Sequence, residues 1–266
     1  MHQADESAAR NRLIANRRAR RLRRFWRTLP SPPRCKLCTS PFGAPFGPPL
    51  RLIGKGRWPG NPRYCAGCFR DLYRHRDGAE VDCTLFFADV RGSTALAETM
   101  RPGDFRALLD RFYAVAAEVL VDHEAVVDKF VGDEVVGIFI PALAGAEHPT
   151  RAIDAGLALL MATGSDGLTP WIPIGIGVNS GEAYVGAVGT AEHVEFTALG
   201  DVVNTAARLA TEAGAGELLV PVETASRAGL AIADLERREL DLRGKSAPTS
   251  VLVVVAAGQP VGSTSP

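Results

Sequence analysis

The sequence lacks a long run of apolar residues, carries no net charge and has only five cysteines in 266 residues. The first absence predicts that no helix spans a membrane, because a spanning helix needs about 20 mostly apolar residues. The N-terminus is basic but has no apolar stretch of the kind found in secretory signals, so we expect a cytoplasmic protein. In a reducing compartment the cysteines are expected to bind metal rather than form disulfides.

Composition divides the chain into four segments. Residues 1–30 hold nine Arg and only two acidic residues, although 30 Lys and Arg balance 30 Asp and Glu overall. Residues 31–75 are rich in Pro, Gly and Cys, residues 81–257 alternate apolar runs with amphipathic stretches, and residues 258–266 are small and polar. We therefore expect a basic helical arm, a small cysteine module, one globular domain and a disordered tail.

The third segment predicts a mixed α+β domain. Short apolar runs predict strands at Cys83–Val90, Val126–Val131, Val135–Ile140, Ile172–Val178, Ala183–Val188, Leu218–Val220 and Val251–Val255. Apolar residues at helical spacing predict helices at Pro102–Glu124, Thr150–Ala162 and Asp201–Glu212. Gly132-Asp133 between two strands predicts a hairpin turn, and Asn179-Ser180-Gly181 predicts a break between two others. The helices are expected on one face of the sheet.

Two motifs place an aspartate where a strand ends. Asp89 ends an apolar run and is followed by Gly92, Ser93 and Thr94 before a helix. Free backbone N–H groups at a helix N-terminus bind phosphate, and an adjacent Asp can hold Mg²⁺ on the same phosphates. Asp133, at the hairpin tip, adds a second carboxylate, and two such groups can hold two hard cations. The alternatives are that Asp89 only caps the helix and that Gly132-Asp133 is an ordinary turn.

A third motif supplies an Asn/Arg pair. Residues 195–209 read as strand, loop and helix, and Asn204 and Arg208 lie four apart on that helix, hence on one face. The three motifs, in this order, resemble the class III adenylyl/guanylyl cyclases. The resemblance covers residues 81–257 and none of residues 1–75.

The resemblance implies a ferredoxin-like βαββαβ fold with the active site between two domains. It implies that Asp89 and Asp133, with the Val90 carbonyl, bind two Mg²⁺ or Mn²⁺ ions per site. Backbone N–H groups at Ser93 and Thr94 are expected to face the β- and γ-phosphates.

The same resemblance assigns the other substrate contacts. Asn204 orients the ribose, and Arg208 stabilises charge on the pentavalent phosphorus. Lys245, in Arg243-Gly244-Lys245, falls where the family has a lysine for the terminal phosphates. Lys129 and Thr197 match the two positions that read the purine.

The purine-reading residues favour ATP. A Lys donates to adenine N1 and a Thr hydroxyl accepts from the exocyclic amine, whereas guanine presents a donor at N1. Guanylyl members usually carry an acid and a Cys at these positions. Thr197 in place of the more usual Asp is similar to the subgroup that includes bicarbonate-responsive cyclases. A guanylyl or pyrimidine nucleotidyl cyclase stays an alternative.

Every catalytic position is filled in one chain, so the resemblance implies a symmetric homodimer with two sites. Two rivals stay open. Val131-Gly132-Asp133-Glu134-Val135 is similar to the GGDEF turn of diguanylate cyclases, although Val131 replaces the first Gly and that family has no Asn-x-x-x-Arg helix. The other is a zinc-based sensor that binds nucleotide without turnover.

The cysteines of residues 31–75 form two CxxC pairs, Cys35/Cys38 and Cys65/Cys68. Four thiolates suit a structural, tetrahedral Zn²⁺. Disulfides or a redox pair are the alternatives. The gap of 26 residues between the pairs predicts a protruding loop. Cys83 lies in an apolar strand and is expected to be core.

The basic arm predicts a helix with scattered apolar residues, namely Leu13, Leu22, Phe25, Trp26 and Leu29. Such a helix could bind an anionic membrane or nucleic acid. A solvated helix that extends the dimer interface is the interpretation we favour.

Overall fold

The structure is a computed structural model that describes residues 17–58, 61–74, 78–165, 169–190 and 194–256. The chain forms two compact units. The first, here the cysteine unit, comprises Met1–Asp82, Ile140–Gly145 and Glu182–Leu199; the second, the sheet unit, comprises Cys83–Phe139, Ala146–Gly181 and Gly200–Pro266. The expected disordered tail and the first sixteen residues of the arm lie outside the described residues and stay predictions.

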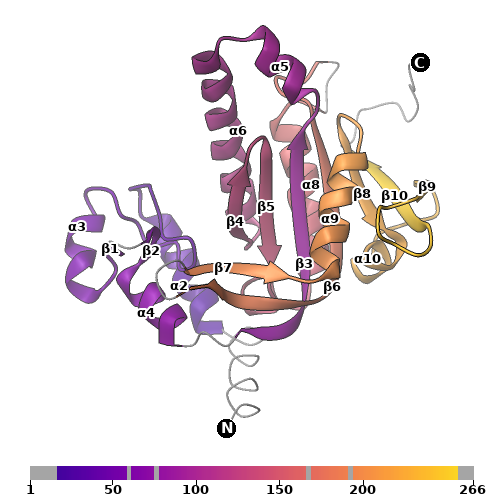
Figure 1. Cartoon of the computed structure of the whole chain (residues 1–266). Helices are drawn as coiled ribbons and strands as arrows, with labels where there is room; N and C mark the ends of the chain where they lie inside the picture. The colour runs from indigo at the N-terminus through magenta and orange to yellow at the C-terminus, as the bar shows by residue number, and fades with distance from the viewer. Residues whose placement is uncertain (1–16, 59–60, 75–77, 166–168, 191–193, 257–266) are drawn as a thin grey trace. The chain divides into compact units, whose positions relative to one another are not determined.

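Helices and strands are interspersed along the chain (Figure 1). The helices are α2 (Arg17–Thr28), α3 (Gly47–Leu50), η1 (Arg51–Ile53), α4 (Ala66–Arg74), α5 (Ser93–Thr99), α6 (Pro102–Asp122), α7 (Pro141–Ala144), α8 (His148–Ala162), α9 (Asp201–Glu212) and α10 (Val222–Arg227). The strands are β1 (Arg57–Trp58), β2 (Asn61–Cys65), β3 (Ala79–Val90), β4 (Val126–Val131), β5 (Glu134–Phe139), β6 (Ile174–Gly189), β7 (Val194–Leu199), β8 (Glu217–Pro221), β9 (Glu236–Leu240) and β10 (Thr249–Val255). Among the described residues, no helix is both long and apolar enough to cross a bilayer.

The main sheet has the order β4-β5-β3-β6-β8-β10-β9, with β7 paired to β6. In chain order, β3, α6, β4, β5, α8 and β6 form a βαββαβ unit whose first strand lies between the third and the fourth. This is the ferredoxin-like arrangement, and it confirms the expected fold. The sheet continues through β8, which pairs in parallel with β6.

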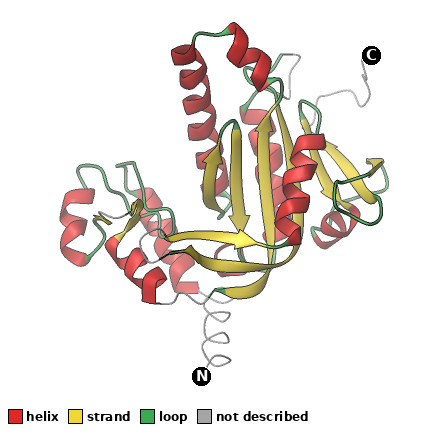
Figure 2. Ribbon diagram, viewed as in Figure 1, coloured by secondary structure: helices red, strands yellow, loops and turns green. Residues whose placement is uncertain are grey.

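Helices cover both faces of the sheet, whereas the sequence led us to expect one (Figure 2). Successive residues of a strand point to opposite faces. On β8, Leu218 meets α8, because a Cβ added at Gly156 would lie 2.2 Å from its Cδ1 atom. Its neighbour Leu219 clusters instead with Leu209 of α9 and with Ala213. The expectation is therefore wrong for α9, which packs opposite α8.

The expected break at Asn179-Ser180-Gly181 is also wrong, because β6 runs through it. The buried polar groups find partners instead of forming a turn: Asn179 Nδ2 donates to the Val202 carbonyl at 3.2 Å, and Ser180 Oγ lies 2.7 Å from Thr84 Oγ1. Satisfied in this way, polar residues do not interrupt a buried strand. The charged strand β9 was not predicted either, since its residues carry no apolar run.

The described part of the basic arm is held to the rest of the cysteine unit by a few side chains, while Arg18, Arg21 and Arg24 stay exposed as expected for a solvated helix. The Arg23 side chain is buried and donates to the Leu37 carbonyl at 2.6 Å. Arg34 donates to the carbonyls of Trp26 and Leu29 at 2.9 and 2.7 Å, which satisfies the C-terminal end of α2.

Candidate active site and cysteine cluster

The two predicted metal carboxylates lie at neighbouring strand ends in the sheet unit. Asp89 on β3 is paired in register with Glu134, the first residue of β5. The Val90 amide donates to the Asp133 carbonyl at 3.3 Å, so the turn holding Asp133 is fixed against the end of β3. Gly132 enables that turn, because its φ of 60° is a conformation that other residues rarely adopt. Hard oxygen ligands grouped in this way suit Mg²⁺ or Mn²⁺.

Sequence reasoning missed two charged neighbours of these carboxylates. Arg91 pairs with the Asp89 carboxylate and donates to the Thr211 carbonyl at 2.7 Å, near the C-terminus of α9. Glu134 is a third acid at the site; burial, and then the charge of Asp133, raise its pKa. Both residues flank the motif aspartates in sequence, and their charge was the available signal.

The segment predicted to face the phosphates comes directly after β3 in the chain. Gly92 adopts a left-handed conformation and α5 begins at Ser93. The amides of Ser93 and Thr94 belong to the first helical turn, where no preceding helical carbonyl accepts from them. They therefore have the donor arrangement that anion binding needs.

The α9 helix presents the Asn/Arg pair. Asn204 is exposed and Arg208 is half-buried one turn further on. Lys245 forms an ion pair with Asp201 of the same helix. A Cβ added at Gly244 would lie 3.4 Å from Arg208 Nη2. The Arg243-Gly244-Lys245 loop thus lies along the α9 face that carries Arg208, although the two are far apart in sequence.

The two predicted purine-reading residues lie in different units. Lys129 on β4 keeps 45% of its side chain exposed and lies 3.5 Å from the buried carboxylate of Asp128, where β4 has a bulge. Thr197 is buried on β7, opposite Gly186 of β6, in the cysteine unit. The other predicted catalytic and phosphate positions and the predicted Mg²⁺ or Mn²⁺ ligands all lie in the sheet unit.

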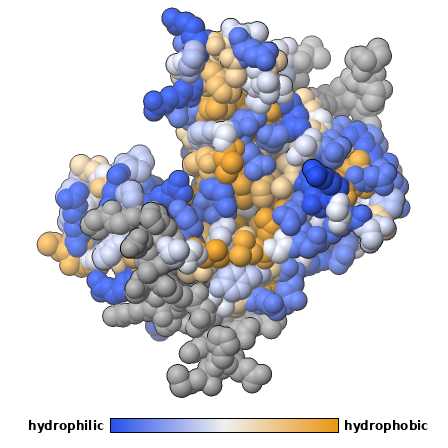
Figure 3. Space-filling model, viewed as in Figure 1, coloured by the Kyte–Doolittle hydropathy of each residue, from blue (hydrophilic) through white to orange (hydrophobic). Residues whose placement is uncertain are grey.

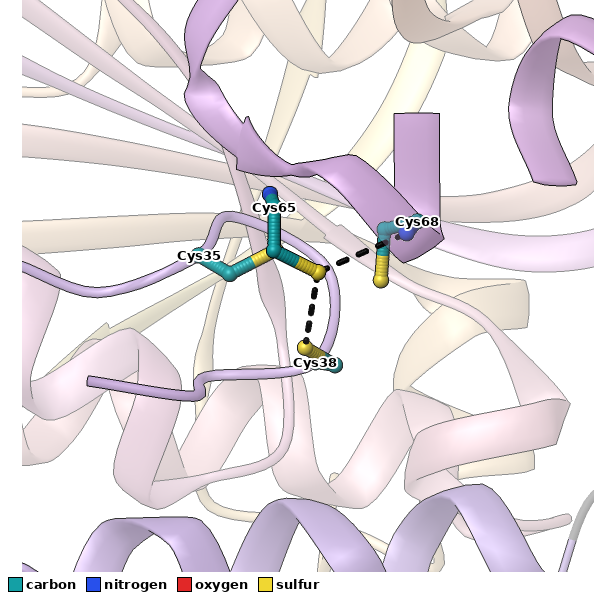
Figure 4. Close-up of side chains that lie close together, drawn as sticks. All are labelled: Cys35, Cys38, Cys65 and Cys68. Carbon is teal, nitrogen blue, oxygen red and sulfur yellow. Dashed lines mark hydrogen bonds between the residues drawn. The ribbon is translucent and has the colours of Figure 1, made fainter. Parts of the chain in front are cut away.

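The four predicted zinc ligands form a cluster (Figure 4). The sulfur atoms of Cys35, Cys38, Cys65 and Cys68 all lie within 4.8 Å of one another, and none is in a disulfide. Zn–S bonds of about 2.3 Å in a tetrahedron place two sulfurs about 3.8 Å apart. The distance from Cys38 Sγ to Cys65 Sγ is 3.7 Å, so the cluster has the size that zinc requires.

The surroundings of the cluster favour thiolates. The Cys65 amide donates to Cys35 Sγ at 3.3 Å, and the Cys68 amide donates to Cys65 Sγ at 3.4 Å. Lys55 Nζ lies 3.9 Å from Cys38 Sγ. Burial alone would lower the pKa of Lys55, but the neighbouring thiolates, Cys38 first, raise it. This cation offsets part of the negative charge that four thiolates leave on a Zn²⁺ ion.

The sheet is ferredoxin-like and carries two carboxylates at adjoining strand ends, with a helix N-terminus beside them. A further helix carries an Asn/Arg pair. Together these features define a nucleotidyl cyclase catalytic domain. The family model for the adenylate and guanylate cyclase catalytic domain matches residues 77–254. The chain belongs to this family.

One curated protein and two solved cyclase structures are similar to this chain. An uncharacterised protein of Mycobacterium tuberculosis is 36% identical over 201 residues, 71% of this chain, and the match spans 34% of that protein's length. The crystal structure of the adenylyl cyclase CyaB from P. aeruginosa has a TM-score of 0.60 and 28% identity, and the match covers 69% of this chain and 98% of CyaB. The guanylyl cyclase Cya2 has a TM-score of 0.62 at 24% identity, over 70% of this chain and 97% of Cya2, which shows the fold alone.

Proposed function

We propose that this chain is an adenylyl cyclase that converts ATP to 3′,5′-cyclic AMP and pyrophosphate at a homodimer interface. The observation that carries the proposal is the register of β3 with β5, which brings Asp89 and Asp133 to neighbouring strand ends. Similarity alone does not choose the base, because both an adenylyl and a guanylyl cyclase share the fold.

Cyclisation requires the ribose 3′-oxygen to attack the α-phosphorus while pyrophosphate leaves. Asp89, Asp133 and the Val90 carbonyl would hold two divalent cations, which would lower the pKa of the 3′-hydroxyl and offset phosphate charge. The Ser93 and Thr94 amides hold the β- and γ-phosphates.

The α9 helix and the loop along it complete the site. Asn204 hydrogen-bonds the ribose, which orients the 3′-oxygen toward the α-phosphorus. Arg208 stabilises the charge that develops in the transition state, an interaction that typically contributes about 3–4 kcal/mol. Lys245 binds the terminal phosphates after it releases Asp201, its partner in the free chain.

Lys129 and Thr197 select ATP. Lys129 donates to adenine N1, and the Thr197 hydroxyl accepts from the exocyclic amine. Guanine carries a hydrogen-bond donor at N1, so with GTP the Lys129 ammonium would face another donor. The exposed half of the Lys129 side chain gives it the reach that this contact needs. A response to bicarbonate, as in the Thr-type subgroup, is a further hypothesis, which activity unchanged by bicarbonate at fixed pH would remove.

Exposed apolar surface supports the homodimer. Phe130 and Val131 at the tip of β4 are 41% and 53% exposed, and Tyr113 of α6 stacks on Phe130. Over its 21 residues, α6 buries only Phe112, Ala116 and Leu120. Figure 3 shows hydrophobic surface among hydrophilic atoms on this part of the sheet unit. A second copy would cover it.

The cysteine cluster holds a structural Zn²⁺, supported by its sulfur spacing. Residues 7–70 contain no acidic residue, so the basic arm and the module together attract anionic surfaces, either a membrane or nucleic acid. The test measures binding to DNA and to anionic liposomes across salt concentrations, with and without residues 1–30. The three outcomes that it separates are binding to DNA, binding to liposomes and no binding.

A product assay tests the activity. The full chain is incubated with ATP, GTP, CTP or UTP and either Mn²⁺ or Mg²⁺, and products are identified by mass spectrometry. We expect 3′,5′-cyclic AMP to dominate, to vanish in Asp133→Asn, and to persist in Asp154→Asn, an exposed acid on α8. Dominance of another cyclic nucleotide would support the guanylyl or pyrimidine alternative. Nucleotide binding without any cyclic product would support the zinc sensor.

Complementation tests the dimer. If the carboxylates of one protomer meet the Asn/Arg pair of its partner, then Asp89→Asn and Arg208→Ala are each inactive alone. Mixed, they form heterodimers with one intact site, which restores about a quarter of the wild-type activity. No recovery after demonstrated subunit exchange would refute the shared site.

A further inference from the structure

The residues next to the zinc ligands hold the backbone of β7. The Phe196 amide donates to the Tyr64 hydroxyl at 3.0 Å, and the Phe196 carbonyl accepts from Lys36 Nζ at 3.1 Å. Lys36 directly follows Cys35, and Tyr64 directly precedes Cys65. Both backbone polar groups of one residue are thus bound by the module that the cysteines organise.

These contacts take the place of a neighbouring strand. Among the described strands, β7 pairs only with β6, so its other edge has backbone groups that need partners. A residue's N–H and C=O point to the same side of an antiparallel strand. Phe196 therefore points both groups away from β6, toward Tyr64 and Lys36, and Figure 1 shows β7 reaching the helices and strands of the module.

The two contacts are buried and linked to each other. Tyr64 is fully buried, and the Lys36 side chain is 5% exposed. The Lys36 amide donates to the Arg63 carbonyl at 2.8 Å, which joins the two cysteine-bearing segments. The Lys36 ammonium also lies 3.6 Å from Glu195 of β7. A buried cation with these partners is costly to displace, so the strand and the module are held in one arrangement.

Thr197 follows Phe196 directly, and its position on β7 is set by the same backbone. We propose that Lys36 and Tyr64 are positioning residues for Thr197, so that the four-cysteine module determines how strongly the site prefers adenine. This inference rests on the proposed function, in which Thr197 accepts from the adenine amine. The module then acts as a specificity element of the cyclase and not as a separate appendage.

Two conservative variants test the proposal. Tyr64→Phe keeps the ring and removes only the oxygen that accepts from Phe196; Lys36→Met keeps most of the stem and removes the donor. We expect each to lower the ratio of kcat/KM for ATP to that for GTP by about 2- to 10-fold, the range of one lost hydrogen bond. The loss should appear mainly in the KM for ATP and equally in the affinity for a non-hydrolysable ATP analogue. Lys36→Arg should retain most of the ratio.

The controls separate positioning from general stability. Arg63→Gln removes an ion pair to Glu195 whose side chains are 56% and 45% exposed, so the ATP/GTP ratio should stay unchanged. Zinc content should stay unchanged in all of these variants. A merely structural role would lower activity toward ATP and GTP equally and leave the ratio intact, which would overturn the proposal.

A double-mutant cycle with Thr197→Ala distinguishes failure of the positioning by Lys36 and Tyr64 from failure of the role proposed for Thr197. If Tyr64 acts through Thr197, Tyr64→Phe should cause little further loss of selectivity in the Thr197→Ala background. Additive losses would refute the coupling. If Thr197→Ala itself leaves the ATP/GTP ratio unchanged, the assumed role of Thr197 fails. If Thr197→Ala changes the ATP/GTP ratio but Tyr64→Phe and Lys36→Met do not, only the positioning role of Lys36 and Tyr64 is refuted.

Discussion

At Gly177 the backbone of α9 lies close against the sheet, and adding one methyl group there should move the helix. A Cβ at Gly177 would lie 2.2 Å from the Ala206 carbonyl oxygen and 2.3 Å from the Ala210 nitrogen. Ordinary contact begins at 3.4 Å, so α9 must retreat by about 1 Å. Both atoms are helix backbone and cannot rotate away. We expect Gly177→Ala to lose about 1–3 kcal/mol of unfolding free energy, the usual cost of overpacking a core.

The same displacement should reach the chemistry, because α9 carries Asn204 and Arg208. A misplacement of about 1 Å can reduce the rate about 100-fold. Urea unfolding measures the stability, and cyclic nucleotide production measures kcat.

Two matched glycines provide controls for Gly177→Ala. At Gly156 an added Cβ would clash with the end of the Leu218 side chain, which can change rotamer, and would make ordinary contact with Phe86, so Gly156→Ala should cost less. Gly103→Ala on α6 meets nothing within 4 Å and should be neutral or stabilising. Equal stability and activity for Gly177→Ala and Gly103→Ala would refute this account of how α9 is seated.

Three further outcomes are expected. Glu217 binds Arg238 through hydrogen bonds of 2.8 and 2.7 Å; burial raises its pKa, but the bonds from Arg238 and the Gly214 amide lower it overall. The stabilisation is therefore full above the ordinary Glu pKa and lost as pH falls through the lowered one, so Glu217→Gln should cost about 1.5–3 kcal/mol at neutral pH and little in acid, by urea unfolding at each pH. Cys38→Ser should purify without zinc by elemental analysis while Cys83→Ala keeps it, and full zinc in Cys38→Ser would contradict the site. Arg208→Ala should reduce kcat about 10²–10³-fold with little change in KM, and a kcat within twofold of wild type would contradict its role.

The local sequence pattern was sufficient to predict most elements and to identify the motif residues. The α9 helix has the predicted bounds, Asp201–Glu212, because its buried residues repeat at helical spacing. The predicted hairpin at Gly132-Asp133 is present, because a glycine with positive φ suits the turn. The two CxxC pairs predicted the cysteine cluster, because their spacing is a property of the chain itself. The roles assigned to the sheet unit's site residues stay predictions.

Contacts between distant segments were not predictable in the same way. Polarity at Asn179-Ser180-Gly181 indicated a break, but partners at Thr84 and Val202 satisfy those groups within a continuous strand. Nothing near Asp89 indicates that Arg91 also reaches the carbonyl of Thr211.

By itself, the sequence determined most of the strands and helices of the sheet unit and the family to which they belong, since periodicity and motif spacing are local. Tertiary structure decided which face of the sheet α9 covers, where its backbone lies close against Gly177. It also decided that Lys36 and Tyr64 hold Phe196 across separations of 160 and 132 residues. Such contacts depend on the packing of elements whose own sequences do not indicate which other elements they contact.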